Sequence, residues 1–267
     1  MGVLDDILAA KRNEVTLLHR PSVRETLRRR ALDAPRARDF AAALRPADGS
    51  LAVIAEIKRR SPSKGELAPD LDAATTAKGY EAGGASCLSV LTDVGWFGGS
   101  VDDLRTARDA TDLPVLRKDF TIDETQVYET RAIGADAILL IVAAVPDDAL
   151  LAELHQLAED LGLAALVEAH DDAEVERALA AGARIVGVNS RNLTTFEEDL
   201  GVAQRLVARL PGGVTAVAES AIRSTGDAAR MAEAGFDAVL VGETLVRSAD
   251  PSSLVRSFRT LHPSRRR

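Results

Sequence analysis

A turn made of small residues recurs four times along this chain at a nearly constant spacing. Its central glycines, Gly84, Gly134, Gly182 and Gly235, lie roughly fifty residues apart. Each turn follows an amphipathic stretch typical of a helix and precedes a short apolar run typical of a strand. Glycine just past a helix end supplies the left-handed cap that such a helix needs. Because consecutive turns leave room for a second strand and helix, the repeat predicts pairs of strand–helix units.

Eight apolar segments of strand length alternate with helical patterns. The predicted strands lie at residues 51–58, 86–92, 114–118, 137–143, 163–169, 184–189, 214–219 and 238–242. The helical patterns lie at residues 71–82, 124–133, 148–161, 171–181, 202–210, 225–234 and 251–261. Eight such units in about 220 residues are typical of a (β/α)8 TIM barrel, an α/β fold. A doubly wound open sheet is the alternative, but no G-x-G-x-x-G sequence follows the first strand, where that fold binds phosphate.

Residues 1–50 contain further helical patterns, at 3–19 and 23–32, with a break around 34–36. We expect these residues to form an N-terminal helical extension that packs on a barrel at 51–262, so that residues 1–267 make one domain. Residues 263–267, which end in three arginines, are predicted to be a disordered tail.

The composition restricts both the core and the setting of the protein. Hydrophobic residues make up 46% of the chain and aromatic residues only 3%, so the core must consist mainly of Ala, Val, Leu and Ile. Cys87, the single cysteine, is expected to be a buried apolar residue in a reducing compartment. No run reaches the ~20 apolar residues of a membrane span, and the acidic start does not resemble a signal peptide. We therefore expect a cytoplasmic protein with no membrane partner.

The net charge of −8 is unevenly distributed, since basic residues concentrate in the first fifty and the last twelve residues. The cluster Arg28, Arg29 and Arg30 is predicted to be a solvated helix face. A nucleic-acid site would need a basic face with aromatic residues, so no nucleic-acid partner is expected. No His or Cys spacing suggests a metal site. The expected assembly is a monomer or a weak homo-oligomer.

Six of the predicted strands end in ionisable or amide side chains that an apolar core would not tolerate. The active site of a TIM barrel lies at the C-terminal ends of its strands. Side chains alternate along a strand, so Glu56 and Lys58 point the same way. Salt bridges that close the barrel mouth account poorly for the whole set, which therefore predicts an active site. The strand-end residues are Glu56, Lys58, Arg117, Lys118, Asp119, Glu168, Asn189, Arg191, Glu219, Ser220, Gly242 and Glu243.

Not every polar residue near these strand ends is expected to be functional. Asp119 alternates to the face opposite Lys118 and is predicted to be structural, although a mouth ion pair between the two is an alternative. His170 is expected to face away from Glu168 as a surface or helix-cap residue.

A basic, hydroxyl-bearing loop at 58–64 and the turns at 220–221 and 242–243 favour a phosphorylated small-molecule substrate.

The segments that carry these residues resemble those of the indole-3-glycerol-phosphate synthase family of tryptophan biosynthesis. The resemblance runs from about residue 3 to residue 255. Its most specific stretches are E-I-K-R-R-S-P-S-K-G (56–65), S-V-L-T-D (89–93) with F-G-G-S (97–100), P-V-L-R-K-D-F (114–120), L-V-E-A-H (166–170), G-V-N-S-R-N-L (187–193), A-E-S (218–220) and V-G-E-T-L (241–245).

The resemblance implies a carboxy-lyase that needs no cofactor. It would convert 1-(2-carboxyphenylamino)-1-deoxyribulose 5-phosphate to indole-3-glycerol phosphate, carbon dioxide and water. Lys118 would protonate the ribulose carbonyl during ring closure. Glu56, Lys58 and Glu168 would share the acid and base roles of the dehydration, whose division stays open. The implied catalytic residues are Glu56, Lys58, Lys118, Glu168, Asn189 and Ser220; the substrate-binding residues are Arg191 and Glu219; the phosphate-binding residues are Lys58, Ser61, Ala221, Gly242 and Glu243.

One position departs from the family pattern, because Ala221 stands where the family usually has glycine. If the backbone there needs a positive φ, alanine costs about 1 kcal/mol. Trp96 is expected either to cover the aromatic ring of the substrate or to pack on the surface. Two other functions stay open: an aldolase-like Schiff base on Lys118 or Lys58, and a barrel that binds a ligand without catalysis.

Overall fold

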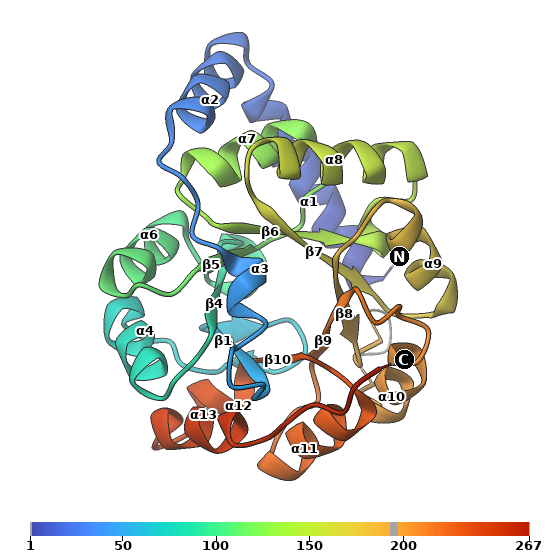
Figure 1. Cartoon of the computed structure of the whole chain (residues 1–267). Coiled ribbons are helices and arrows are strands. Elements are labelled where there is room, and N and C mark those ends of the chain that lie inside the picture. Colours follow the sequence, from blue (N-terminus) through green and yellow to red (C-terminus); the bar gives the residue numbers. More distant parts are fainter. Residues whose placement is uncertain (1, 193–196, 267) are drawn as a thin grey trace.

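Eight parallel strands close into a barrel in the computed structural model, which describes residues 2–192 and 197–266 (Figure 1). The strands follow one another around the ring, which closes where β1 pairs with both β4 and β10. The predicted TIM barrel is confirmed, and each strand lies within its predicted segment. The strands are β1 (Ala52–Ile57), β4 (Cys87–Leu91), β5 (Val115–Lys118), β6 (Ala137–Ile141), β7 (Ala164–Ala169), β8 (Ile185–Asn189), β9 (Thr215–Glu219) and β10 (Ala238–Val241).

Helices follow the strands and cover the outside of the barrel (Figure 1). They are α4 (Ala73–Ala82), α6 (Val101–Ala110), α7 (Glu124–Ala132), α8 (Asp148–Asp160), α9 (Asp172–Ala180), α10 (Leu200–Val207), α11 (Thr225–Ala234) and α13 (Pro251–Arg259). Each begins after an Asp or Ser whose side chain accepts a backbone N–H of the first turn, which stabilises the helix start.

Of these helices, α6 was absent from the sequence prediction. It buries only Leu104 and Ala107, so its sequence is dominated by charged residues and gives a weak apolar pattern. The loop after β1 also holds a small antiparallel pair, β2 (Arg60–Ser61) and β3 (Gly65–Glu66), that was not predicted. Three short helical segments complete the loops: α5 (Val94–Phe97), η1 (Val142–Ala144) and α12 (Glu243–Val246).

Residues 2–50 form the predicted helical extension, which reaches both ends of the barrel. Its helices are α1 (Val3–Leu18), α2 (Pro21–Asp33) and α3 (Phe40–Ala43). Helix α2 packs on α7 and projects from one side (Figure 1). Helix α3 closes the end where the strands begin, since Phe40 and Leu44 are fully buried in the barrel interior. Helix α1 lies at the other end, where Ile7 and Leu8 are buried.

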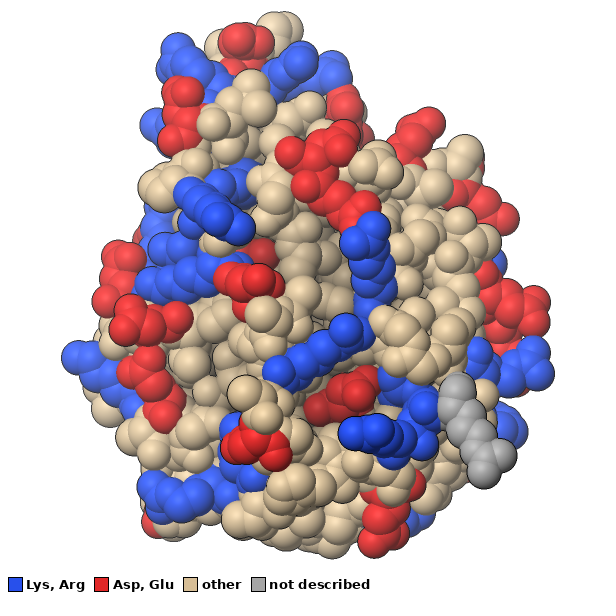
Figure 2. Space-filling view, viewed as in Figure 1, with Lys and Arg blue, Asp and Glu red and all other residues tan. Residues whose placement is uncertain are grey.

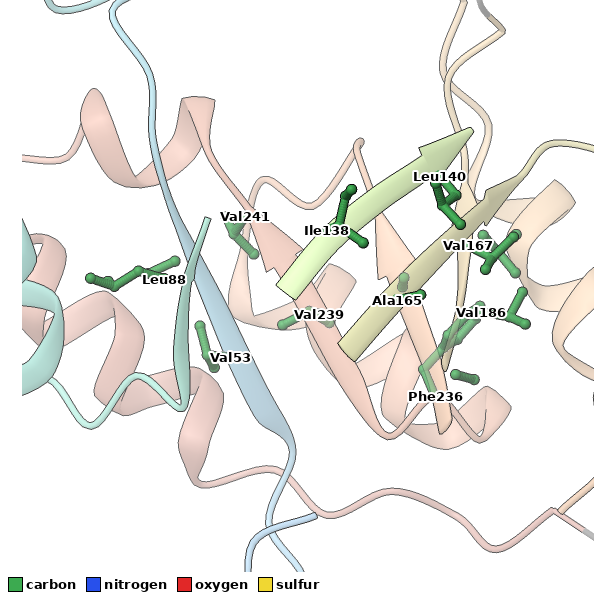
Figure 3. Close-up of a cluster of buried hydrophobic side chains, with 14 of the residues drawn as sticks. Val53, Leu88, Ile138, Leu140, Ala165, Val167, Val186, Phe236, Val239 and Val241 are labelled. Carbon is green, nitrogen blue, oxygen red and sulfur yellow. The ribbon is translucent and has the colours of Figure 1, made fainter. Parts of the chain in front are cut away.

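The apolar core has two layers separated by the sheet. Outward-facing side chains such as Val53, Leu88 and Ile138 pack between strands and helices (Figure 3). Their inward-facing neighbours, among them Ile54, fill the barrel together with α3. Cys87 is fully buried in this inner layer, as predicted. Alternation along the strands therefore builds both layers from small aliphatic residues.

The surface carries charges of both signs. On the face seen in Figure 2, acidic and basic side chains are interspersed. Arg28, Arg29 and Arg30 are exposed, as predicted. The segment predicted to be a disordered tail contacts the barrel through Arg266, whose Nη2 lies 2.7 Å from Asp237 Oδ2; residue 267 lies outside the described part. Among the described residues, no helix combines the length and the hydropathy needed to cross a membrane.

Candidate active site

The end of β1 places Glu56 and Lys58 side by side, as alternation predicts. Lys58 Nζ lies 2.6 Å from Glu56 Oε1, and Ser89 Oγ donates to the other oxygen at 3.5 Å. Burial raises the pKa of Glu56, but Lys58 and Lys118 outweigh burial and hold the pKa below its ordinary value. Gly242 leaves room for this pair, because a Cβ there would lie 2.2 Å from Glu56 Oε1.

Lys118, at the end of β5, lies between two carboxylates from distant strands. Its Nζ is 3.0 Å from Glu168 Oε2 and 2.7 Å from Glu219 Oε2. Burial lowers the pKa of Lys118, but these carboxylates and Glu56 outweigh it and raise the pKa, so the amine stays an ammonium. The alternative pairing with Asp119 is wrong, because Asp119 pairs with Lys11 and Arg117 instead. Its side chain points away from that of Lys118, as alternation along the strand requires.

The two carboxylates beside Lys118 differ in their affinity for a proton. Burial raises the pKa of Glu168, yet Lys118 and His170 hold it well below its ordinary value. Burial and the nearby Glu168 charge instead raise the pKa of Glu219, against the effect of Lys118. Glu168 is therefore the carboxylate that stays ionised, and Glu219 is the one that takes up a proton more readily. Glycine at position 187 leaves room for the Glu219 carboxylate, because a Cβ on residue 187 would lie 2.0 Å from Glu219 Oε1.

Asn189 and Arg191, at and after the end of β8, extend the hydrogen-bonded network around Glu168. Asn189 Nδ2 donates to Glu168 Oε1 at 3.0 Å, and Asn189 Oδ1 accepts from the backbone N–H of Arg191 at 3.0 Å. The Arg191 Nε donates to Glu198 Oε1 at 3.0 Å, and Glu198 also pairs with Arg223. Glu198 was not predicted from the sequence, because it lies seven residues beyond Arg191 in a loop without a strand pattern.

The end of β9, which pairs with β8, is followed by two unusual backbone positions. Ser220 and Ala221, directly after β9, have φ values of 64° and 59°, in the left-handed region that favours glycine. Ala221 therefore has the positive φ that would make alanine strained at this position. Gly242 and Glu243 follow β10 and begin α12.

These residues surround one cavity of about 250 Å³ at the C-terminal end of the barrel. Of the predicted site residues, Ser61 does not line it: Ser61 is buried in β2, and its neighbours Pro62 and Ser63 face the cavity instead. The predicted site residues that line the cavity are Glu56, Lys58, Lys118, Glu168, Asn189, Arg191, Glu219, Ser220, Ala221, Gly242 and Glu243.

One wall of the cavity is apolar, which was not predicted from the sequence. Phe97 and Phe120 contribute to this wall with ring centroids 6.1 Å apart. Val3, Leu4 and Ile7 of α1 also line the cavity. Phe120 lies two residues after Lys118, so alternation was a usable signal for it. Trp96 does not line the cavity; its neighbour Phe97 takes the place proposed for Trp96.

His170 also lies differently from its prediction. Its ring Nε2 is 3.2 Å from Glu168 Oε1, so it does not face away from Glu168. The two residues are separated by one position, and side chains two positions apart share a face in an extended chain. The predicted position near a helix start is closer to the structure, because the ring Nδ1 of His170 lies 2.9 Å from Glu174 in the first turn of α9.

Comparison with known proteins identifies the family. The family model for indole-3-glycerol phosphate synthase matches residues 4–258. This chain belongs to the indole-3-glycerol phosphate synthase family. The synthase of Laribacter hongkongensis is 49% identical over 254 residues, which cover 94% of this chain and 96% of that protein. The synthase of Micrococcus luteus is 50% identical over 262 residues, 97% of each chain.

Family membership confirms the predicted function, an indole-3-glycerol phosphate synthase of tryptophan biosynthesis, and its enzyme class, a carboxy-lyase. More distant solved structures share the barrel alone. A 3-hexulose-6-phosphate synthase from Salmonella typhimurium has a TM-score of 0.63 at 17% identity, over 79% of this chain and 97% of that chain. A thiamine phosphate pyrophosphorylase from Pyrococcus furiosus has a TM-score of 0.61 at 17% identity, over 80% and 96%.

Proposed function

We propose that this synthase cavity binds 1-(2-carboxyphenylamino)-1-deoxyribulose 5-phosphate with its aromatic ring against the apolar wall. The phosphate would lie at the opposite side, near Ser220–Ala221 and Gly242–Glu243. The observation that carries the proposal is the position of Lys118, an ammonium held between Glu168 and Glu219 within the cavity. The ketone of the substrate then lies between the two ends, next to the acid that its chemistry needs.

Ring closure uses Lys118 as a general acid. The ring carbon that bears the carboxylate attacks the ribulose C2 carbonyl, and a carbon–carbon bond forms. The carbonyl oxygen gains negative charge as its double bond opens, and Lys118 gives it a proton. Because the two carboxylates raise the pKa of Lys118, the amine is protonated when substrate arrives. The carboxylate then leaves as carbon dioxide, and its electron pair restores the aromatic ring.

Dehydration needs both a base and an acid. We assign the base to Glu168, whose lowered pKa keeps it ionised, and the acid to Lys58, which Glu56 orients at 2.6 Å. Glu168 removes a proton from ribulose C1 while Lys58 protonates the hydroxyl on C2. The carbon–oxygen bond breaks, a carbon–carbon double bond forms, and water leaves. Proton transfers of this kind typically contribute ~10²–10⁴-fold each.

The remaining cavity residues would bind and orient the substrate. Arg191 offers a planar guanidinium to a carboxylate, and Asn189 holds Glu168 from the side. Glu219 lies beside Lys118 and would contact the substrate as the predicted binding residue. Ser63, whose buried hydroxyl has no partner among the described residues, replaces Ser61 as the phosphate ligand from the loop after β1. Localisation in the cytoplasm and the monomeric or weakly oligomeric state stay predictions.

The product assay tests this assignment. Purified protein given the carboxyphenylamino substrate should generate indole fluorescence without added metal or cofactor. The Lys118→Met variant should lose roughly 10²-fold or more in kcat. Lys78→Met, the same change on the exposed surface of α4, is the matched control and should keep full activity. Turnover that survives unchanged in Lys118→Met would contradict the assignment.

The Schiff-base alternative needs a neutral amine with an available electron pair. The carboxylates around Lys118 favour the ammonium instead, which argues against a Schiff base on Lys118. Borohydride trapping with ketose phosphates distinguishes the synthase mechanism from the Schiff-base alternative. A covalent adduct would support the Schiff base, and its absence would exclude it.

A further inference from the structure

His170 is an ionisable residue in contact with the catalytic centre that the proposed steps do not use. It follows directly after β7, and it is not one of the residues that line the cavity. Its Nε2 lies 3.2 Å from Glu168 Oε1, the same oxygen that accepts from Asn189. Its side chain is only 14% exposed, so water screens this contact weakly.

Helix α9 fixes the orientation of the His170 ring. Glu174 Oε2 accepts from the backbone N–H of His170 at 2.8 Å and lies 2.9 Å from ring Nδ1. Glu174 is itself held in the first turn, where its backbone N–H donates to the helix cap Asp171 at 2.8 Å. With Nδ1 fixed on α9, Nε2 is the nitrogen left to face Glu168.

The charged groups around His170 keep it protonated. The groups that act on it are Glu168 from β7 and Glu174 from α9, and Lys118 from β5 lies on the far oxygen of Glu168. Burial lowers the pKa of His170, but the two carboxylates outweigh it and raise the pKa to about 10. Glu168 therefore lies between two cations at neutral pH, Lys118 on one oxygen and His170 on the other.

We propose that His170 is a positioning residue that holds Glu168 ionised and oriented toward the substrate throughout the reaction. The inference rests on the proposed role of Glu168 as the base. A second cation is needed because Lys118 loses its charge when it protonates the substrate during ring closure. Glu168 would then lose the cation that favours its carboxylate form just before it is needed as a base. His170 is a cation that the substrate does not consume, so it keeps Glu168 ionised for the dehydration.

Kinetics of His170→Gln test the proposal. Glutamine keeps a polar side chain at this position but has no charge. We expect kcat to fall roughly ten-fold while KM changes less than about two-fold, and the acid limb of the pH profile of kcat/KM to move up by about 1 unit. His262→Gln, a change of the same kind at an exposed position, is the control and should match the wild type. Thermal unfolding of each variant separates these effects from a loss of folded protein.

A direct titration of the His170 ring tests the proposal a second time, with the variant Glu174→Gln. In protein labelled at its histidines, the His170 ring signal, assigned by its loss in His170→Gln, should stay protonated through pH 8. In Glu174→Gln the same signal should titrate at least about 1 unit lower, and kcat should fall with the deprotonation of the ring.

The outcomes separate this inference from the proposed function. If Glu168→Gln abolishes turnover but His170→Gln has wild-type kcat and an unchanged acid limb, the inference is overturned and the function of Glu168 stands. If Glu168→Gln keeps full activity, the assignment of the base fails. An unprotonated His170 ring at pH 7 in the wild type would also overturn the inference.

Discussion

Lys11 of α1 forms a 2.9 Å ion pair with Asp119, the residue next to Lys118 in the chain. The same ammonium lies 2.8 Å from Asp93, the cap of α5, and the Lys11 side chain is only 3% exposed. One buried cation therefore joins the N-terminal extension to the loops after β4 and β5. Those loops carry Phe97 and Phe120, so the extension is an integral part of the cavity wall.

Replacing Lys11 by methionine should destabilise the protein strongly. The variant would leave the buried carboxylates of Asp93 and Asp119 without their shared cation, a change that typically costs about 3–5 kcal/mol. We expect a loss of this size in the free energy of unfolding, measured with urea. Lys78→Met on the exposed face of α4 should change it by less than about 0.5 kcal/mol. Equal stability of the two variants would mean that the Lys11 ion pairs contribute nothing.

Asp119 should make stability depend on pH in the acid range. Burial raises its pKa, but Arg117 and Lys11 outweigh burial and hold the pKa below the ordinary value of 3.8. The folded chain then binds this proton more weakly than the unfolded chain does. The contribution to stability is therefore present above pH 3.8 and is lost as the pH falls through the lower folded-state pKa.

The variant Asp119→Asn removes this titration. We expect its free energy of unfolding to fall less steeply between pH 5 and pH 2.5 than that of the wild type, when urea unfolding is followed at each pH. Identical slopes in both proteins would contradict the lowered pKa of Asp119.

Gly242→Ala should damage the Glu56–Lys58 pair without removing either residue. The added Cβ would lie 2.2 Å from Glu56 Oε1 and 3.1 Å from Lys58 Nζ, so the pair must move. We expect kcat/KM to fall roughly 10²-fold, since the orientation of Lys58, the proposed dehydration acid, is lost. Gly213→Ala is the matched control, because a Cβ there meets nothing within 4 Å. Activity of Gly242→Ala equal to that of the control would show that the pair tolerates displacement.

Ala221→Gly should relieve backbone strain beside the proposed phosphate position. Ala221 has a φ of 59°, which costs an L-residue about 1–2 kcal/mol, and the greater freedom of glycine in the unfolded chain offsets about 0.4–1 kcal/mol. We expect a net gain of between about 0 and 1.6 kcal/mol in the free energy of unfolding. Ala47→Gly, at an exposed loop position outside the left-handed region, should give no gain. A loss of stability in Ala221→Gly would contradict strain at this position.

Local patterns predicted most of the barrel. Short apolar runs fixed the positions of the strands, and the turns near Gly134 and Gly235 marked helix ends where φ is indeed positive. Features with weak local patterns were missed. Helix α6 buries only two residues, and α3 is four residues long with no period to detect. The β2–β3 pair depends on how the loop folds back over the cavity, which no strand pattern encodes.

The sequence by itself determined which residues stand at the strand ends and which of them share a face. Glu56 and Lys58 are two positions apart on one strand, so alternation alone makes them neighbours. The same rule, applied correctly, also places His170 on the side of Glu168.

Only the tertiary structure decided which of these groups touch across the barrel. Lys118 meets Glu168 and Glu219 because strands far apart in sequence converge at one mouth, and the distances depend on barrel closure and stagger. The protonation states of these three groups depend on those distances and on burial. Neither can be read from the sequence of a single strand. That is why the sequence named both carboxylates, while the structure separated Glu168 as the ionised one from Glu219.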